Sequence, residues 1–355
     1  MTPPIARPAT PTARMKVSSP GDLLGLVPYL LGFRPSESLV LLLIGAGRVR
    51  LTARLDLPRV QLPPVDVSRG ELTPAAAVPA LLGQFRELVE QTNADAMMLV
   101  GYSSRPEATR QLLELVAASL EPLGLIDALY VDDARWWSVL RPVGDGPGEG
   151  TPYDLDSHPM AAEAVYAGLT AAGGRAEIEA RVTGPSAAEL APLERLGHEA
   201  MVTLADLTRG QRQELMSAEV SAFVAAPRRL DDAECARLAV LCYDLHVRDV
   251  AWVAMDRATI GQHLDLWGQV VARSVAPWEL APLCLFGMAA WISGDGATQN
   301  CCTERALGLD PSYTMAGLLD DINRRVLAPT HWDSMAVELR REVLGAAAKK
   351  TTRRR

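Results

Sequence analysis

Apolar positions in the first 140 residues alternate between runs typical of strands and spacings typical of helices. Residues 38–44 form a continuous apolar run that predicts a strand buried on both faces, and residues 49–55 alternate as a half-buried partner strand does. Gly45, Ala46 and Gly47 provide the turn between them. The further predicted elements are a helix at 75–91, a strand at 96–101, a helix at 106–120 and a strand at 125–131. This order predicts a layered α/β domain with a mixed sheet, whose last strands are parallel because each returns through a crossover helix.

A helix is also expected before the first strand. Ser19 precedes Pro20 and lies three residues before Asp22, a combination that caps the start of a helix. Pro28 lies too deep for one straight helix, so we expect a short helix, a kink and an exit at Gly32.

The pattern changes in the second half of the chain. From Ser157 onward the apolar spacing is helical and no strand is evident. The predicted helices span residues 160–172, 212–225, 233–255, 263–275, 280–293, 297–307, 312–326 and 334–347. We therefore expect a disordered leader at 1–16, an α/β domain at 17–156, an all-helical domain at 157–345 and a basic tail at 346–355.

The five cysteines all lie in the second half, and none forms a CxxC pair. This pattern predicts buried thiols in a reduced compartment rather than a disulfide framework. Cys235, Leu238, Cys242 and Leu245 form a stripe at helical spacing, which we interpret as core packing. The N-terminus lacks the apolar core of a signal peptide, and the longest apolar stretches are too short to span ~30 Å of hydrocarbon. We expect a cytoplasmic protein without a membrane segment.

Charge separates the ends of the chain from its body. The net charge of −8 combines +3 at residues 1–16 and +5 at residues 346–355 with −16 between them. An acidic body repels phosphate backbones, which argues against a broad nucleic-acid groove. The basic tail could contact an anionic partner locally, but most such tails are only solvated.

Polar and aromatic side chains follow two predicted strands where each strand ends. Asp132, Asp133, Arg135, Trp136 and Trp137 follow the strand at 125–131, and Tyr102, Ser103 and Ser104 follow its neighbour. Ligands of open α/β sheets bind at the carboxyl ends of strands, and these groups could hold a planar or cationic ligand by stacking and hydrogen bonding. The alternative is a sheet edge covered by tryptophans, with Asp132 capping a turn.

Arg34, Glu37 and Ser38 precede the first buried strand. They could form one wall of the same small-molecule pocket. Equally, Arg34 and Glu37 could tie down the entry turn through a charge-assisted hydrogen bond. The sequence does not separate these two interpretations.

The residue patterns typical of metal sites, phosphate-binding loops and catalytic serines are weak or absent in the sequence. Cys242, His246 and Asp249 could share a helix face, but three such residues alone are a weak zinc signature, so no metal site is expected. The Gly45-Ala46-Gly47 segment leads into a strand rather than a helix, and neither GxxxxGK[ST] nor GxSxG occurs in the sequence. We predict no catalytic residue and no cofactor. Tryptophans on the predicted helices, Trp278 among them, are expected to be core or groove residues.

Small residues in the last third of the chain recur at a repeat-like spacing. Gly287, Gly294, Ala306 and Pro311 are separated by 7, 12 and 5 residues. The segment 280–311 therefore resembles a tetratricopeptide helical hairpin, in which small side chains let two helices cross closely.

Several motifs resemble an uncharacterised actinobacterial family, domain of unknown function 4192. They are VPYLLGFRP at residues 27–35, ESLV at 37–40, RWWS at 135–138 and EGTP at 149–152. The resemblance covers most of residues 16–325 and implies no established activity.

Two functions from different classes follow. The first is a non-enzymatic interaction or regulatory protein whose helical half binds a protein partner, because stacked helical hairpins offer a groove. The alternative is a nucleotide-like small molecule bound, hydrolysed or modified at the strand ends of the α/β domain. A weaker third idea is nucleic-acid binding through residues 349–355.

Overall fold

The computed structural model describes residues 15–63, 66–92, 94–132, 134–141, 148–325 and 327–352. Within this part, the chain forms two compact units that meet in sequence between Gly174 and Arg175. The sequence pattern places the change at Ser157 instead. Residues 1–14 of the expected leader and residues 353–355 of the expected tail lie outside the described residues, as do the side chains of 342–352.

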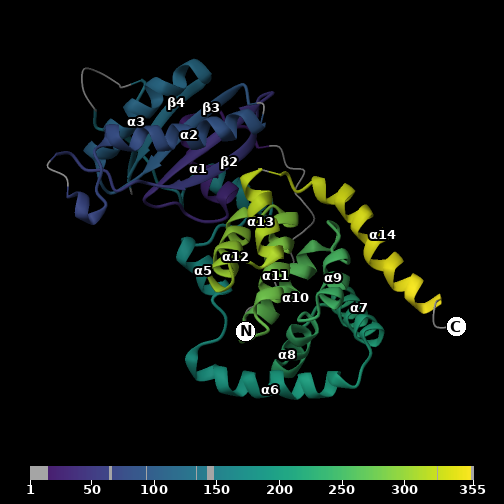
Figure 1. Ribbon diagram of the computed structural model, residues 1–355. Coiled ribbons are helices and arrows are strands. Elements are labelled where there is room, and N and C mark those ends of the chain that lie inside the picture. The colour runs from purple at the N-terminus through teal and green to yellow at the C-terminus, as the bar shows by residue number, and fades with distance from the viewer. Residues whose placement is uncertain are drawn as a thin grey trace. The chain divides into compact units, whose positions relative to one another are not determined.

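The first unit contains a six-stranded sheet in the order β2-β1-β3-β4-β5-β6 (Figure 1). Its strands are β1 (Ser38–Gly45), β2 (Arg48–Asp56), β3 (Ala96–Tyr102), β4 (Leu125–Val131), β5 (Arg135–Ser138) and β6 (Thr151–Pro152). β1 is antiparallel to β2 and β3, whereas β3 and β4 are parallel. The predicted mixed sheet is confirmed, and the last two strands that the sequence predicts, β3 and β4, are parallel. β5 and β6 pair antiparallel and were not predicted as strands.

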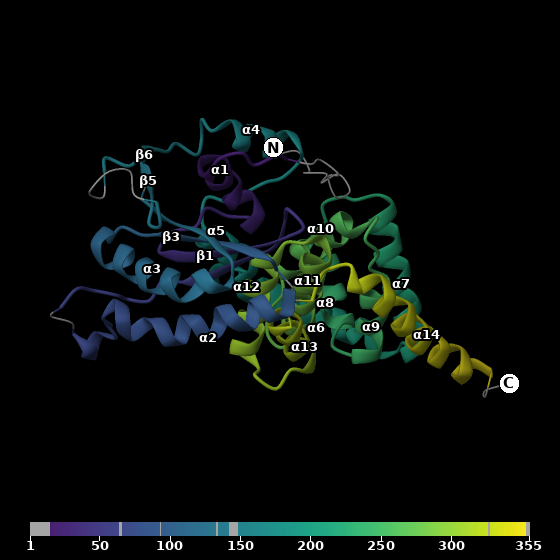
Figure 2. The same cartoon turned by 90° about the horizontal axis from the view of Figure 1, so that it is seen from above.

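Helices cover both faces of the sheet. α2 (Pro74–Thr92) and α3 (Pro106–Leu120) lie on one face, and α1 (Pro20–Leu31) and α4 (Pro159–Tyr166) lie on the other (Figure 2). Alternate residues of β1 pack with α2 and α3, for example Leu41 with the core that includes Phe85 and Leu113. Residues 38–43 of β1 are all buried, so the strand buried on both faces is confirmed.

α1 contains a proline whose missing hydrogen bond is replaced. Ser19 and Asp22 form the predicted capping box, and the helix continues through Pro28 to a left-handed Gly32 with φ of 83°. Proline has no N–H to donate to the carbonyl four residues earlier, which here belongs to Leu24. The hydroxyl of Tyr153 donates to that carbonyl at 3.0 Å instead. α1 can therefore hold a proline in its interior.

The second unit is helical. Its helices are α5 (Arg175–Val182), α6 (Ala187–Ala205), α7 (Arg209–Ala225), α8 (Asp232–Leu241), α9 (Leu245–Val253), α10 (Ile260–Val271), α11 (Leu280–Ser293), α12 (Gly296–Leu309), α13 (Thr314–Arg324) and α14 (His331–Thr352). The predicted fold class, α/β followed by an all-helical half, is confirmed. No helix in the described ranges is both long enough and apolar enough to cross a bilayer.

Three helix predictions were wrong in detail. The sequence pattern missed α5 and α6, and it predicted one helix at 233–255 where the chain forms α8 and α9. The break occurs because the Asp244 side chain caps α9, accepting a hydrogen bond from the His246 amide at 3.1 Å. Cys242 remains buried, whereas Leu245 is 47% exposed, so the predicted packing stripe ends at the break.

α11 and α12 form the predicted helical hairpin. Gly294 ends α11 in the left-handed conformation, with φ of 84°. A Cβ atom at Gly287 would lie 2.9 Å from Cβ of Cys302 on α12, so this crossing admits only glycine without adjustment. The close crossing confirms the hairpin, and its likeness to a tetratricopeptide repeat stays a prediction.

Candidate functional site

The predicted sheet-edge residues do meet at one edge of the first unit. Tyr102 at the end of β3 pairs with Ser38 at the start of β1 and with Val131 at the end of β4. The segment before β1 and the loops after β3 and β4 therefore lie together, as the parallel arrangement of β3 and β4 requires.

Glu37 is bound by the loop after β3. Its carboxylate accepts hydrogen bonds from the Ser104 amide at 2.7 Å, the Ser104 hydroxyl at 2.8 Å and the Arg105 guanidinium at 2.8 Å. Burial alone would raise the pKa of Glu37, but these three bonds outweigh it and hold the pKa below its usual range. Arg34 instead forms an ion pair with Asp156. The proposed link between Arg34 and Glu37 was therefore wrong, because each finds its partner in a distant segment.

Asp132 and Arg135 shape the turn that leads into β5. The carboxylate of Asp132 accepts hydrogen bonds from the amides of Ala134 at 2.8 Å and Arg135 at 2.6 Å. The Arg135 guanidinium donates to the carbonyls of Glu149 at 2.7 Å and Gly150 at 2.9 Å. These hydrogen bonds match the turn-capping alternative. Asp133, also named in this motif, lies outside the described residues.

The paired tryptophans lie on opposite faces of the sheet. Trp137 packs on Tyr130, with ring centroids 5.3 Å apart, on the face covered by α2 and α3. Trp136, its neighbour in β5, lies beside Gly21 of α1 on the other face. Successive side chains of a strand alternate between faces, so the two indoles cannot stack on one ligand.

Two predicted residues complete this edge. The Ser38 hydroxyl donates to the Ser36 carbonyl at 2.6 Å and accepts from Arg54 at 2.8 Å. The Tyr102 hydroxyl is buried and has no hydrogen-bond partner among the described residues, and burial raises its pKa well above the usual range. Binding of a small molecule at this edge stays a prediction. Most of its polar groups are already engaged within the chain.

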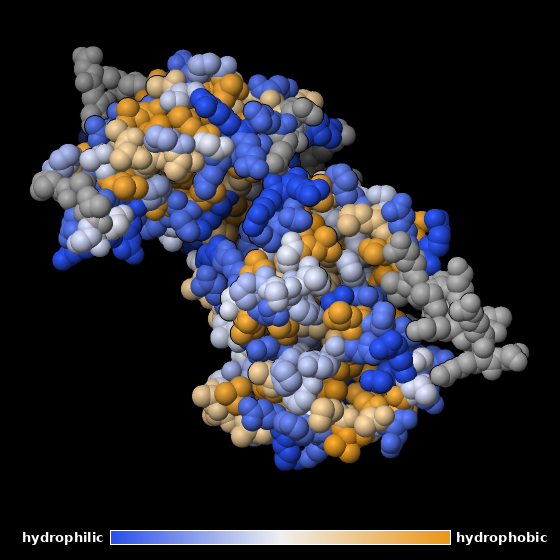
Figure 3. Space-filling model, viewed as in Figure 1, coloured by the Kyte–Doolittle hydropathy of each residue, from blue (hydrophilic) through white to orange (hydrophobic). Residues whose placement is uncertain are grey.

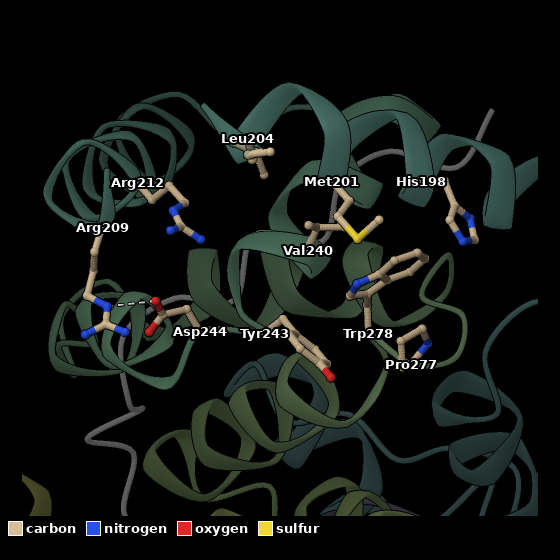
Figure 4. Close-up of a pocket in the computed structure, with 11 residues that line it drawn as sticks. His198, Met201, Leu204, Arg209, Arg212, Val240, Tyr243, Asp244, Pro277 and Trp278 are labelled. Atoms are coloured by element: carbon tan, nitrogen blue, oxygen red, sulfur yellow. Dashed lines mark hydrogen bonds and ion pairs between the residues drawn. The ribbon is translucent and has the colours of Figure 1, made fainter. Parts of the chain in front are cut away.

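The helical unit contains an open cavity of about 670 Å³. It lies between α6, α7, the turn that joins α8 to α9, and the segment before α11 (Figure 4). The lining is mostly apolar and consists of His198, Met201, Leu204, Ala205, Arg209, Arg212, Val240, Tyr243, Asp244, Pro277 and Trp278. Met201 and Tyr243 are 47% and 66% exposed, whereas Trp278 is 6% exposed. Exposed apolar side chains thus stand at the mouth, and a buried indole lies beneath them.

The two arginines of the cavity differ in their partners. Arg209 donates to Asp244 at 2.8 Å, and this bond, with that from the His246 amide, outweighs burial and holds the pKa of Asp244 below its usual range. Arg212 forms no ion pair with any described residue, and its Nε atom is buried without a hydrogen-bond partner. Its side chain extends from α7 into the cavity (Figure 4). An unpaired buried donor costs about 1–3 kcal/mol, and more when it is charged.

Comparison with known proteins places this chain in a family. The sequence model of a family described as Domain of unknown function (DUF4192) matches residues 20–330. The chain belongs to this family. No curated protein matches the DUF4192 chain, and no solved structure matches it. The family description names no activity.

A close contact between α6 and the segment before α11 forms the floor of the cavity in the DUF4192 chain. A Cβ atom at Gly197 would overlap the ring of Trp278. The indole also meets the His198 ring edge-on, with centroids 5.2 Å apart. The position of Trp278 therefore depends on the absence of a side chain at Gly197.

The surface over α6 is mixed in character. Apolar patches are interspersed with hydrophilic residues in this part of the DUF4192 chain (Figure 3). Leu190, Met201 and Val202 are among its exposed apolar side chains. Only Leu193, Gly197 and Leu204 of α6 are buried, so one face of the helix packs inward and much of the rest is accessible.

Sequence reasoning missed this cavity because it missed α6. A usable signal existed: Ser186 with Glu189, and Thr208 with Gln211, form capping boxes that mark the starts of α6 and α7. Arg212, Met201 and Tyr243 carry no motif of their own.

The described residues hold no cluster of three or more metal-ligating side chains. Cys242 is the C-cap of α8, whereas His246 and Asp249 lie on α9, so the suggested trio does not share one helix face. The Asp249 carboxylate also pairs with Arg248 at 2.6 Å. All five cysteines are free and buried. Burial raises the pKa of Cys235 and Cys301 to about 11, which keeps these thiols protonated at neutral pH.

Proposed function

We propose that this DUF4192 chain is a non-enzymatic interaction or regulatory protein whose helical unit binds a segment of a protein partner. The observation that carries the proposal is the cavity between α6 and the α8–α9 turn, with exposed apolar side chains at its mouth and an unpaired guanidinium inside. Exposed apolar groups around a preformed hollow are typical of sites that bind other proteins.

Three finer expectations belong to the same proposal. The likeness of α11 and α12 to a tetratricopeptide hairpin supports a scaffold of stacked helices, which commonly binds peptides. Free, buried cysteines suit a cytoplasmic location. An actinobacterial origin rests only on the resemblance of the sequence motifs. Neither nucleic acid nor a membrane is part of this proposal.

Site-directed photocrosslinking of the full-length chain in its host cells tests the proposal. A benzophenone amino acid replaces Tyr243 at the cavity mouth, or Val337 on α14 as a control of similar exposure, 53% against 66%. We expect a discrete protein adduct from Tyr243 that Val337 does not give and that Met201→Glu removes. Identical adducts from both positions, or none from Tyr243, would contradict the proposal.

A second candidate function is the binding of a small, nucleotide-like molecule at the sheet edge. The buried, unpartnered hydroxyl of Tyr102 favours it, since such a group gains a partner when a polar ligand arrives. Thermal-shift screening of metabolites tests it, because a ligand raises the melting temperature by mass action. Tyr102→Phe should abolish the shift from any hit. A broad metabolite library without hits would remove this candidate.

A further inference from the structure

We infer that the cavity of the helical unit selects an acidic segment, in which one Asp or Glu carboxylate lies beside a large apolar side chain and pairs with Arg212. This inference rests on the proposed function and names the chemistry of its partner.

The charge balance of the cavity points to a single carboxylate. Arg209 and Asp244 neutralise each other through their 2.8 Å contact. Arg212 then leaves one unmatched positive charge in the lining when His198 is neutral. A guanidinium binds a carboxylate through two parallel hydrogen bonds. In Arg212 the two terminal Nη groups can supply them, since only Nε is buried without a partner in the described part of the chain.

The apolar part of the lining explains why the proposed segment has an apolar side chain beside its carboxylate. Trp278 and Leu204 are buried at 6% and 4% exposure and offer an apolar wall, whereas Met201 and Tyr243 stand exposed at the mouth. Leu190 lies on the same helical face of α6 as Gly197 and Met201, at spacings of seven and eleven residues. A segment that crosses the mouth can therefore place its carboxylate at Arg212 and an adjacent apolar side chain against Met201 and Trp278. These two residues lie on the other side of Arg212 from the Arg209–Asp244 pair (Figure 4).

The chain's own ends do not complement this site. Residues 1–16 and 346–355 are basic, with net charges of +3 and +5. An unpaired arginine repels basic segments, so a separate acidic partner fits better than either end. A long polyanion such as nucleic acid fits poorly too, since the body of the chain carries −16.

Fluorine NMR of the full-length chain labelled with 5-fluorotryptophan tests the inference. The Trp278 resonance is assigned by its loss in Trp278→Phe. The probes are two tripeptides, acetyl-Leu-Glu-Leu-amide and acetyl-Leu-Gln-Leu-amide, titrated to millimolar concentration. We expect the glutamate peptide to shift the Trp278 resonance with at least about tenfold tighter affinity than the glutamine peptide.

Two variants distinguish a specific contact with the Arg212 guanidinium from a general attraction between the acidic peptide and positively charged side chains. Arg212→Gln should bind the glutamate and glutamine peptides with equal affinity. Arg195→Gln, at an exposed arginine of α6 outside the lining, should still prefer the glutamate peptide. A third peptide, acetyl-Leu-Leu with a free C-terminal carboxylate, should bind more weakly than the glutamate peptide.

Each contrary outcome has a distinct meaning. Equal affinity of the glutamate and glutamine peptides would overturn the inference and leave the proposed function standing. Tighter binding of the free C-terminus would also overturn it, in favour of a chain end as the ligand. A Trp278 resonance that moves with protein concentration alone would point to a second copy of this chain instead. No shift with any peptide would count against both the inference and the proposed function.

Discussion

Arg212 brings an unpaired charge into the cavity at a cost to the stability of the chain. Its Nε atom is buried without a partner, and replacing such a group with an apolar side chain of similar length removes the desolvation penalty. We predict that Arg212→Met raises the free energy of unfolding by about 1 kcal/mol. Urea unfolding measures this, with Arg195→Met as the control that changes stability by less than about 0.5 kcal/mol. If Arg212→Met instead lowered the free energy of unfolding by about 1 kcal/mol, the guanidinium would be shown to stabilise the fold.

His263 on α10 makes the helical unit sensitive to acid. The side chain is 1% exposed, its Nδ1 atom has no partner among the described residues, and burial lowers its pKa to about 4. The unfolded chain binds the proton more readily, so the neutral histidine stabilises the fold above pH 6.5 and this contribution is lost as the pH falls toward 4. We predict that this residue lowers the free energy of unfolding by about 2 kcal/mol between pH 8 and pH 5.

Comparing variants isolates the effect of His263 from other titrating groups. In His263→Phe, the free energy of unfolding should differ less between pH 8 and pH 5 than it does in the unchanged chain. His331→Gln changes an exposed histidine, so its free energy of unfolding should change between pH 8 and pH 5 as much as that of the unchanged chain. Equal pH dependence in all three chains would show that His263 is not the acid-sensitive group.

At the scale of single elements, α6 depends on a glycine that ordinary helix propensity disfavours. Alanine stabilises helices by up to about 1 kcal/mol relative to glycine, but at Gly197 a methyl group would overlap the Trp278 ring. We predict that Gly197→Ala destabilises the chain by about 1–3 kcal/mol. Gly210→Ala in α7, where nothing lies within 4 Å of an added Cβ, should be neutral or stabilising. A stabilised Gly197→Ala variant, seen by thermal unfolding, would contradict the packing described for the cavity floor.

α1 makes a second prediction at this scale. Tyr153→Phe removes the donor that replaces the missing N–H of Pro28, so it should cost about 1–2 kcal/mol. In a Pro28→Ala background the new N–H can bond to Leu24 itself, and Tyr153→Phe should then cost less. A double-mutant cycle by urea unfolding measures the coupling, expected at about 1 kcal/mol. Independent, additive effects would show that the two groups do not substitute for one another.

Elements with strong local patterns could be predicted from the sequence. β1 is a continuous apolar run, α1 has its capping box, and α11 ends at Gly294, so each was located correctly. α6 was missed because it buries only three residues and therefore lacks a wide apolar stripe. The break between α8 and α9 was missed because apolar spacing continues across it, and only the capping by Asp244 marks it.

The candidate sites show the limit of sequence reasoning more sharply. Topology correctly predicted that Tyr102 and Asp132 meet at one edge of the sheet, whereas the place of Glu37 was left open between two interpretations. Their partners could not be predicted, since Arg105 and not Arg34 binds Glu37, and such choices depend on tertiary packing. The cavity in the helical unit is assembled from four separate segments, which no local pattern connects.

At the scale of the whole molecule, the chain combines two units with different interiors. The first is a sheet with helices on both faces, and its polar edge is largely satisfied by its own hydrogen bonds. The second is helical and leaves a hollow with an unmatched charge. This difference is the reason for assigning partner binding to the helical unit rather than to the sheet edge.

Hydrogen–deuterium exchange on the full-length chain, alone and with the protein recovered by crosslinking at Tyr243, tests this assignment most directly. We predict slower amide exchange in α6, in the first turns of α7 and at residues 242–244 when the partner is bound, with little change in residues 134–141. Protection confined to the sheet edge, or none in α6, would contradict the binding of a partner by the helical cavity.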